Sequence, residues 1–312
     1  MSEQRIKSNF YVLKYLALEE SLCFMEMKYL FREEIKAKCF FSDSGISPSR
    51  SPFIKHRIAV EYSADTLEKL LRIIEEHKTS YTRFKFVRFK IENGELEYAE
   101  WIRSVTQIGN AIDGEADMEN PLVLLAAAPV GGKWIFGEYE ENDNEWKYHD
   151  KKPNTNSHSL GIRTARALVN IAVGPEKKRT LIDPCCGVGT VLIEAASMGI
   201  EASGREINPL IASKAAENLA FFGIDNIITL GDMHDIKETF DAAIVDIPYG
   251  LFTPITLKEQ QEIILTARRI ARKMVIITFE DMDAFLLSSG FSIIDRCQVH
   301  KGKFTRYISV CV

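Results

Sequence analysis

Two glycines and an acidic residue lie together in residues 183–190, DPCCGVGT. Gly187 and Gly189 allow the backbone to pass close to a ligand, and a helix that begins after them would point its N-terminal amides toward that ligand. A dinucleotide fingerprint would need a third glycine at position 192, where the chain has Leu192. Asp183 would also repel a pyrophosphate. The segment therefore favours a ligand that carries an amine over one that carries a diphosphate.

Acidic residues also follow the next two strands that the sequence predicts. Glu206 lies 23 residues after Asp183, close to the spacing of about 20 residues at which an acid binds ribose hydroxyls in nucleotide folds. Asp232 is placed to accept from the exocyclic amine of adenine. Taken singly, the glycines could form only a tight turn, and each acid could be a helix cap. Together they predict that the chain binds S-adenosylmethionine. The Asp183 carboxylate would accept a hydrogen bond from the ammonium of this cofactor, directly or through water. The predicted cofactor-binding residues are Asp183, Pro184, Gly187, Gly189, Glu206 and Asp232.

The fourth strand of the series ends in Asp246-Ile247-Pro248-Tyr249. The exocyclic amine of a base is a poor nucleophile, so it must be held in line with the methyl carbon while positive charge develops on nitrogen. Asp246 and the carbonyl of Ile247 can each accept an amine proton, and Tyr249 can stack on the base. With an ordinary pKa near 3.9, Asp246 is a weak base that would orient the amine and stabilise the developing charge. The alternative is a proline turn after a buried strand.

This tetrapeptide resembles the fourth motif of the amino-methyltransferases, Asp/Asn/Ser-Pro-Pro-Tyr/Phe, and in particular that of the tRNA guanine-N2 methyltransferases that join a THUMP domain to a Rossmann-type catalytic domain. Ile247 departs from the motif, which has a proline there. Residues 152–170 are similar to the segment that precedes the catalytic domain in this family. That segment helps to hold the methionine end of the cofactor, so the resemblance implies cofactor contacts for Ser157 and His158. A cap or a surface position is the alternative for His158.

The N-terminal half resembles the RNA-binding part of the same family. Residues 83–139 look like a divergent THUMP domain, and the first 60 or so residues would correspond to its ferredoxin-like accessory region. Five cations lie within thirteen residues that contain no acid and are interleaved with aromatic side chains: Lys78, Arg83, Lys85, Arg88 and Lys90. We interpret them as an RNA-facing patch. The alternative is an edge strand with one solvated face, which lysine protects against aggregation.

Regular alternation of strands and helices after residue 160 predicts an α/β protein: a mostly parallel, Rossmann-like methyltransferase sheet with an antiparallel strand from a C-terminal hairpin. A smaller α+β region would precede it, with a helix over 16–32, a helix over 64–76 that Ser63 caps, and a strand over 84–91. The predicted domains are a ferredoxin-like accessory region (1–60), a THUMP-like RNA-binding domain (61–141), a linker (142–157) and a Rossmann-like methyltransferase domain (158–312).

Composition narrows the class of protein. A net charge of −5 argues against coating nucleic acid by bulk charge, and six cysteines without C-x-x-C spacing predict reduced thiols and no structural zinc. The polar first residues carry no secretory signal and no apolar run spans a membrane, so we expect a cytoplasmic protein without membrane or metal partners. We interpret Cys185 and Cys186 as small side chains that allow close approach, not as nucleophiles.

The predicted function is an S-adenosylmethionine-dependent tRNA methyltransferase that forms N2-methylguanosine and could add a second methyl to give N2,N2-dimethylguanosine. The resemblance implies guanosine 10 as the first candidate position and position 6 as the second. Alternatives are methylation of another base amine, such as a guanine of ribosomal RNA or adenine N6, and a non-catalytic RNA-binding partner subunit. A nicotinamide-dependent dehydrogenase is disfavoured by Leu192. The need for an activator subunit and the oligomeric state are left open.

Overall fold

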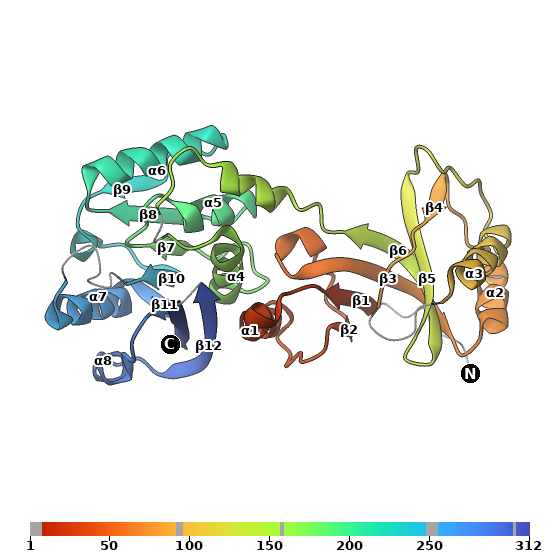
Figure 1. Ribbon diagram of the computed structural model, residues 1–312, viewed down its shortest axis with the longest axis horizontal. Coiled ribbons are helices and arrows are strands. Elements are labelled where there is room, and N and C mark those ends of the chain that lie inside the picture. The colour runs from red at the N-terminus through yellow and green to blue at the C-terminus, as the bar shows by residue number, and fades with distance from the viewer. Residues whose placement is uncertain (1–7, 92–95, 157–158, 248–254, 302–303) are drawn as a thin grey trace. The chain divides into compact units, whose positions relative to one another are not determined.

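The computed structural model describes residues 8–91, 96–156, 159–247, 255–301 and 304–312. The chain divides into two compact units, each built from two segments of the chain (Figure 1). Unit 1 comprises residues 1–14 and 36–143, and unit 2 comprises residues 15–35 and 144–312. The expected boundary at residue 60 falls inside a strand of unit 1, and the expected linker is shared between the units.

Unit 1 is a six-stranded sheet with two helices. The strand order is β2-β1-β3-β6-β5-β4, and all neighbours are antiparallel except β4 and β5. The strands are β1 (Ser8–Leu13), β2 (Cys39–Ser42), β3 (Ile54–Ala64), β4 (Phe84–Phe86), β5 (Val123–Val130) and β6 (Lys133–Glu141). The helices α2 (Leu67–Glu76) and α3 (Tyr98–Ala111) pack against each other, and the short 3-10 turn η2 (Pro48–Arg50) lies beside β3.

A β-bulge in β3 allows one alternating strand to supply two cores. Every second residue of β3 is buried, but the register with β6 shifts between Val60 and Tyr62. Val60 therefore packs with one apolar cluster, and Tyr62 packs with the cluster beneath α2 and α3. Gly137 pairs with Val60, and a Cβ there would lie 2.0 Å from the Ala59 carbonyl oxygen. Only glycine fits this close approach.

Unit 2 is a seven-stranded sheet in the order β12-β13-β11-β10-β7-β8-β9. The five strands from β11 to β9 run parallel, and β13 is antiparallel to both of its neighbours, as the sequence predicts. The strands are β7 (Leu181–Asp183), β8 (Ala202–Glu206), β9 (Ile228–Leu230), β10 (Phe240–Asp246), β11 (Ala271–Thr278), β12 (Ile293–Lys301) and β13 (Phe304–Cys311). The fold class expected from the sequence is confirmed.

Helices pack around this sheet. They are α1 (Glu20–Phe31), α4 (Ile162–Val173), α5 (Thr190–Ser197), α6 (Pro209–Phe221), α7 (Leu257–Ile270) and α8 (Asp283–Ser288), with 3-10 turns η1 (Ala17–Glu19), η3 (Glu145–Lys151) and η4 (Met233–Asp235). Alternate residues of β10, Ala243 and Val245, face α7, and α4 packs against the same strand from the other side. The central strands are apolar runs because both of their faces are buried.

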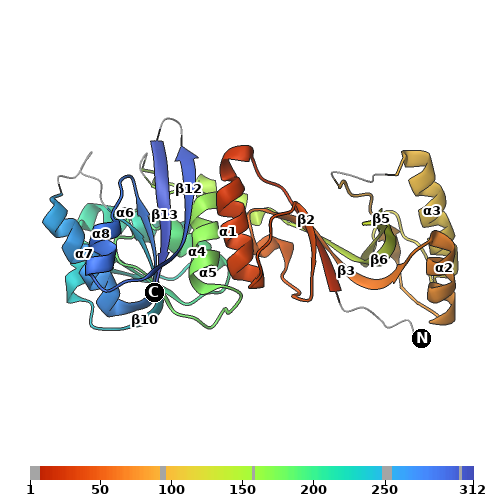
Figure 2. The same cartoon turned by 90° about the horizontal axis from the view of Figure 1, so that it is seen from below.

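The helix nearest the N-terminus, α1, belongs to unit 2 and lies along α4 (Figure 2). The amide of Asn170 donates to the buried Glu26 carboxylate at 2.6 Å, and the Ser21 hydroxyl donates to the Gln298 carbonyl at 2.7 Å. The sequence analysis places this helix in the N-terminal assembly instead. Its apolar residues are spread around the helix and not along one stripe, which is typical of a helix that is buried on several sides.

Three local expectations differ from the structure in their bounds. Thr66, not Ser63, caps α2 by accepting from the Lys69 N–H at 3.3 Å, because β3 continues to Ala64. The strand expected over 84–91 ends at Phe86. Part of the segment expected to be a linker forms the 3-10 turn η3, whose Trp146 is buried in unit 2.

Candidate active site

The acidic residues that the sequence singles out converge at one edge of the sheet in unit 2. Asp183 ends β7, Glu206 ends β8 and Asp246 ends β10, and these strands are parallel neighbours in the order β10-β7-β8. Asp232 follows the next strand, β9, as the cap of η4. The carboxyl ends of parallel strands meet at one edge, where α/β sheets bind ligands. The structure therefore brings together four residues that are separated by up to 63 positions in the chain.

Burial strongly perturbs the carboxyl of Asp183. It is 5% exposed and accepts a hydrogen bond from the Cys185 N–H at 3.3 Å. Burial raises the pKa of Asp183 to about 8, and the negative charges of Asp246 and Glu206 contribute to this rise. Near neutral pH this carboxyl is thus largely protonated. A cation placed beside it would favour the ionised form, because opposite charges stabilise each other.

The glycine loop after β7 has the backbone that its sequence predicts. Gly187 and Gly189 have φ values of 53° and 81°, in the left-handed region that glycine adopts most easily. A Cβ on Gly187 would meet nothing within 4 Å, so this residue borders open space. Thr190 begins α5 directly after the loop, and its buried hydroxyl oxygen has no hydrogen-bond partner. The loop thus presents free space and an unsatisfied polar atom side by side.

Leu192 marks where the loop departs from a dinucleotide fingerprint. In that fingerprint the third glycine permits close packing of the helix on the strand. Here the glycine is on the strand instead, because a Cβ on Gly204 of β8 would lie 2.4 Å from the Leu192 Cδ1 atom. In this chain the helix therefore supplies the large residue of the contact, Leu192, and the strand supplies the glycine, Gly204.

Glu206 holds the loop as well as lining the edge. One carboxylate oxygen accepts from the Gly187 N–H at 3.0 Å, and the other accepts from the Asn208 N–H at 2.8 Å. Each oxygen keeps a lone pair with which it could accept a ribose hydroxyl. Asp232 accepts from the His234 N–H at 2.9 Å, so it is a cap of η4. Its proposed contact with adenine would use the remaining acceptor capacity.

Ile247 has a structural reason to replace the proline of the related motif. Its side chain is 1% exposed and packs in the apolar cluster that contains Ile263 and Met282. Its N–H donates to the Ile277 carbonyl at 3.3 Å and extends the pairing of β10 with β11. Proline has no N–H and could not make this bond.

Several of the expected site residues can be placed and others cannot. Pro184 is buried in the loop after β7. Pro248, Tyr249, Ser157 and His158 lie outside the described residues, so their predicted roles stay predictions.

The sequence analysis missed one residue of this region. Asn218 of α6 is fully buried, and its amide donates to the Val188 carbonyl in the glycine loop at 2.9 Å. Its signal was a polar amide between Ala215 and Leu219 on the buried side of a helix.

Of the two adjacent cysteines, Cys186 is buried and Cys185 is half-buried. Burial raises the pKa of both Cys185 and Cys186, with the neighbouring carboxylates adding to the effect. A thiolate is therefore disfavoured at either position. In the described parts of the chain, no group of three or more His, Cys, Asp or Glu side chains could hold a metal ion. No helix among the described residues is long and apolar enough to cross a membrane.

Two of the basic residues of unit 1 contact other residues of the same unit. Arg83 forms an ion pair with Asp117 at 2.9 Å, and the Lys85 ammonium donates to the Met118 carbonyl at 3.0 Å. Lys78 and Lys90 are exposed. The sheet order places β4 at an edge, as the alternative interpretation expects.

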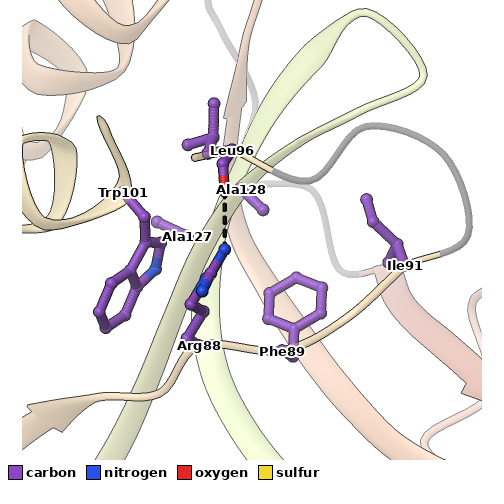
Figure 3. Close-up of a pocket in the computed structure, with 7 residues that line it drawn as sticks. All are labelled: Arg88, Phe89, Ile91, Leu96, Trp101, Ala127 and Ala128. Carbon is purple, nitrogen blue, oxygen red and sulfur yellow. Dashed lines mark hydrogen bonds between the residues drawn. The ribbon is translucent and has the colours of Figure 1, made fainter. Parts of the chain in front are cut away.

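Arg88 lines a small pocket of unit 1. Figure 3 shows its side chain between the rings of Trp101 and Phe89, and its guanidinium donates to the Leu96 carbonyl at 2.9 Å. The guanidinium also lies over the Tyr98 ring, 5.5 Å from the ring centre. Phe89 is 8% exposed. The aromatic residues between the cations therefore contribute mainly to the core of unit 1.

Comparison with known proteins assigns the domain that contains the strand-end carboxylates. Residues 150–278 match the family UPF0020, described as the RMKL-like methyltransferase domain. These residues are therefore similar to a methyltransferase domain, and residues 150–278 are called the methyltransferase domain below. The methyltransferase domain contains Asp183, Glu206, Asp232 and Asp246, the glycine loop and Asn218.

Named relatives match more than half of the chain. The tRNA (guanine(10)-N2)-dimethyltransferase of Methanothermobacter thermautotrophicus is 29% identical over 199 residues, which cover 61% of this chain and 58% of that protein. Its namesake from Pyrococcus abyssi is 30% identical over 52% of this chain and 53% of its own length. The match to the Methanocaldococcus jannaschii enzyme of the same name covers 77% of this chain and 69% of that protein, at 29% identity. The chain thus spans a little over half the length of the first two relatives.

The solved structures that are similar to this chain have low sequence identity to it. TrmN from Thermus thermophilus is 15% identical with a TM-score of 0.47, over 97% of this chain and 99% of that one. A putative RNA methyltransferase from Pyrococcus horikoshii is 17% identical with a TM-score of 0.45, over 54% of this chain and 95% of that one. The description of the fold of the methyltransferase domain therefore rests on the strand order of its own sheet and not on these structures.

Proposed function

We propose that this chain is an S-adenosylmethionine-dependent tRNA methyltransferase that forms N2-methylguanosine at guanosine 10, and N2,N2-dimethylguanosine after a second transfer. The observation that carries the proposal is the convergence of Asp183, Glu206 and Asp246 beside the glycine loop of the methyltransferase domain. The names of the three relatives support the choice of base, amine and position.

The residues at the sheet edge fit this cofactor. Gly187 borders open space that the cofactor could fill, and a side chain at this position would occupy part of that space. The Thr190 hydroxyl is a buried polar atom without a hydrogen-bond partner. The buried Asp183 carboxyl would bind the ammonium of the methionine end, and Glu206 would accept the ribose hydroxyls. Asp232 would receive the adenine amine. When bound, the cofactor supplies a methyl group on a positively charged sulfur, which an amine can attack.

Asp246 is the residue that we assign to the target amine. Its position at the end of β10, next to Asp183 at the end of β7, would set the base amine beside the cofactor end of the site. The carboxylate would accept one amine proton and stabilise the positive charge that develops on nitrogen. Ile247 would contribute its backbone carbonyl and Tyr249 its ring. The base must leave its stack to reach them, at a cost of a few kcal/mol.

Unit 1 is proposed to bind the RNA. Exposed Lys78, Arg83, Arg88 and Lys90 and the half-buried Lys85 would contact phosphates, and the THUMP-like assignment of this region is part of the proposal. Arg83, Lys85 and Arg88 are paired with an exposed carboxylate and with backbone carbonyls. Such contacts can be exchanged for phosphate oxygens at little cost, since surface ion pairs contribute little to stability.

Nucleoside mass spectrometry tests the proposal directly. Unmodified transcribed tRNA is incubated with the purified chain and methyl-labelled S-adenosylmethionine, and a transcript with adenosine in place of guanosine 10 serves as the control. Label in N2-methylguanosine from the first transcript only is the expected result. Label in another nucleoside would reassign the amine, and label that persists in the control would reassign the position. Cofactor binding without any transfer would point to a missing partner subunit or a different substrate.

A further inference from the structure

Asn218 joins the glycine loop after β7 to the segment around Asn154. Its side-chain amide donates to the Val188 carbonyl at 2.9 Å and to the Asn154 carbonyl at 2.9 Å. Its side-chain oxygen accepts from the Asn154 N–H at 2.8 Å. The side chain is completely buried, yet both amide hydrogens and the oxygen are used. An asparagine satisfied in this way is costly to replace, because its backbone partners would be left unpaired.

One of these segments is the glycine loop itself, and the other is bound to it through the same Asn218 amide. Val188 lies between Gly187 and Gly189, whose left-handed backbone forms the loop after β7. Asn154 lies near the start of the methyltransferase domain, three residues before Ser157 in the sequence. Its side chain is fastened to α6 through the Lys214 carbonyl and the Glu217 carboxylate.

The glycine loop is thus held at two adjacent residues from the region of α6. The Gly187 N–H donates to Glu206, whose other carboxylate oxygen accepts from Asn208, the cap of α6. The Val188 carbonyl accepts from Asn218, further along the same helix. Glycines in a loop add conformational freedom, so two fixed points limit the positions that the loop can take. Without the second point, the loop could move away from the position that leaves Gly187 facing open space.

We propose that Asn218 is a positioning residue for the cofactor: it holds the glycine loop and the segment around Asn154 in the arrangement that binds S-adenosylmethionine, without touching the cofactor itself. The inference rests on the proposed function for the identity of the ligand. It assigns to one buried amide a share of the cofactor affinity that neither the acids nor the glycines supply.

Cofactor titration of the full-length chain tests this role. Asn218→Ala should raise the Kd for S-adenosylmethionine about tenfold, the size expected when a pre-arranged loop is released. In steady-state assays with tRNA, the KM for the cofactor should rise by a similar factor and kcat should change much less. The binding measurement needs no RNA, so it stays informative if the proposed nucleic-acid substrate is wrong.

Asn218→Asp gives a second readout. The Asp side chain keeps the acceptor for the Asn154 N–H but turns an oxygen toward the Val188 carbonyl. Protonation of the introduced carboxyl would restore one donor. The ratio of the Kd of this variant to that of the wild-type chain should therefore fall as the pH is lowered, and a purely structural loss would give a constant ratio.

Asn170→Ala provides the matched control. Asn170 is equally buried on a helix, and its amide donates to Glu26 at a contact between α4 and α1. The Asn170→Ala substitution should lower the unfolding temperature without changing the Kd for S-adenosylmethionine. If Asn218→Ala lowers the unfolding temperature but leaves the Kd unchanged, Asn218 is only a structural residue and the inference fails. If the wild-type chain does not bind the cofactor at all, the proposed function fails and the inference fails with it.

Discussion

The acids of unit 2 and the cations of unit 1 are both singled out by residue type and spacing. In the structure, the two groups differ in how closely their members are brought together. Asp183, Glu206 and Asp246 are far apart in the chain and meet at one sheet edge. Arg83 and Lys85 are close in the sequence, yet each contacts a different residue of its own unit. A parallel sheet collects the residues that end its strands. The run of cations in unit 1 instead extends past its strand, because β4 ends at Phe86 and both Arg88 and Lys90 follow it.

Asp246→Ala is the change with the largest expected effect on unit 2. Removing the carboxylate that stabilises charge on the amine should lower kcat by about 1000-fold, the upper range for loss of one preorganised electrostatic group. The cofactor Kd should stay close to that of the wild-type chain. Transfer of labelled methyl groups and titration calorimetry measure the two quantities. A large loss of cofactor binding would contradict the role assigned to Asp246.

Glu194→Ala tests how much the contact between η3 and the rest of unit 2 contributes to stability. The Glu194 carboxylate is fully buried and binds His149 of η3 at 2.7 Å and Arg166 of α4 at 2.8 Å. Its removal leaves the Arg166 guanidinium without a buried counter-charge, so the free energy of unfolding should fall by about 3–5 kcal/mol. Urea unfolding measures the change, and Glu201→Ala, an exposed site in the same unit, is the control. Equal midpoints for the two variants would refute the prediction.

The raised pKa of Asp183 predicts that cofactor binding depends on pH. The folded pKa of about 8 lies above the usual value of 3.8, so this carboxyl favours the folded state most at low pH. That contribution is lost as the pH rises from the unfolded pKa toward the folded one. Binding an ammonium favours the ionised form, so affinity should increase from pH 6 toward pH 8, with release of up to about one proton per cofactor. Calorimetry in buffers of different ionisation enthalpy counts the protons.

Asp183→Asn supplies the control for this prediction. The amide cannot titrate, so any remaining binding should release no proton near neutral pH. Proton release of the same size in the Asp183→Asn variant would assign the titration to a group other than Asp183.

The double change Lys85→Ala and Arg88→Ala has the smallest expected effect and addresses unit 1. It should weaken tRNA binding and reduce the slope of log K against log salt by roughly one unit for each phosphate that is no longer neutralised. Filter binding across a salt series measures the slope, with Lys258→Ala on the exposed side of unit 2 as the control. An unchanged slope would mean that Lys85 and Arg88 serve only to bind the carbonyls of Met118 and Leu96.

Much of unit 2 could be predicted from the sequence because its signals are local. Strand β8 (Ala202–Glu206) and helix α4 (Ile162–Val173) belong to the alternation of strands and helices that the sequence predicts after residue 160. The order of strands and helices implies the parallel sheet, and the sheet implies that Asp183 and Glu206 lie close together. Unit 1 was harder to predict because a β-bulge after Val60 changes which side chains face which core. A change of register is set by partner strands that are distant in the chain.

The sequence by itself determined the fold class, the acids at the strand ends and the glycine loop, because each depends on residue type and spacing within one element or its neighbour. Only the tertiary structure decided that α1 joins unit 2, that Ile247 fills the core, and that Asn218 holds Val188. Those outcomes depend on which buried surfaces and unpaired polar groups meet across long stretches of chain. The free energy of such contacts is defined only when both partners are in place.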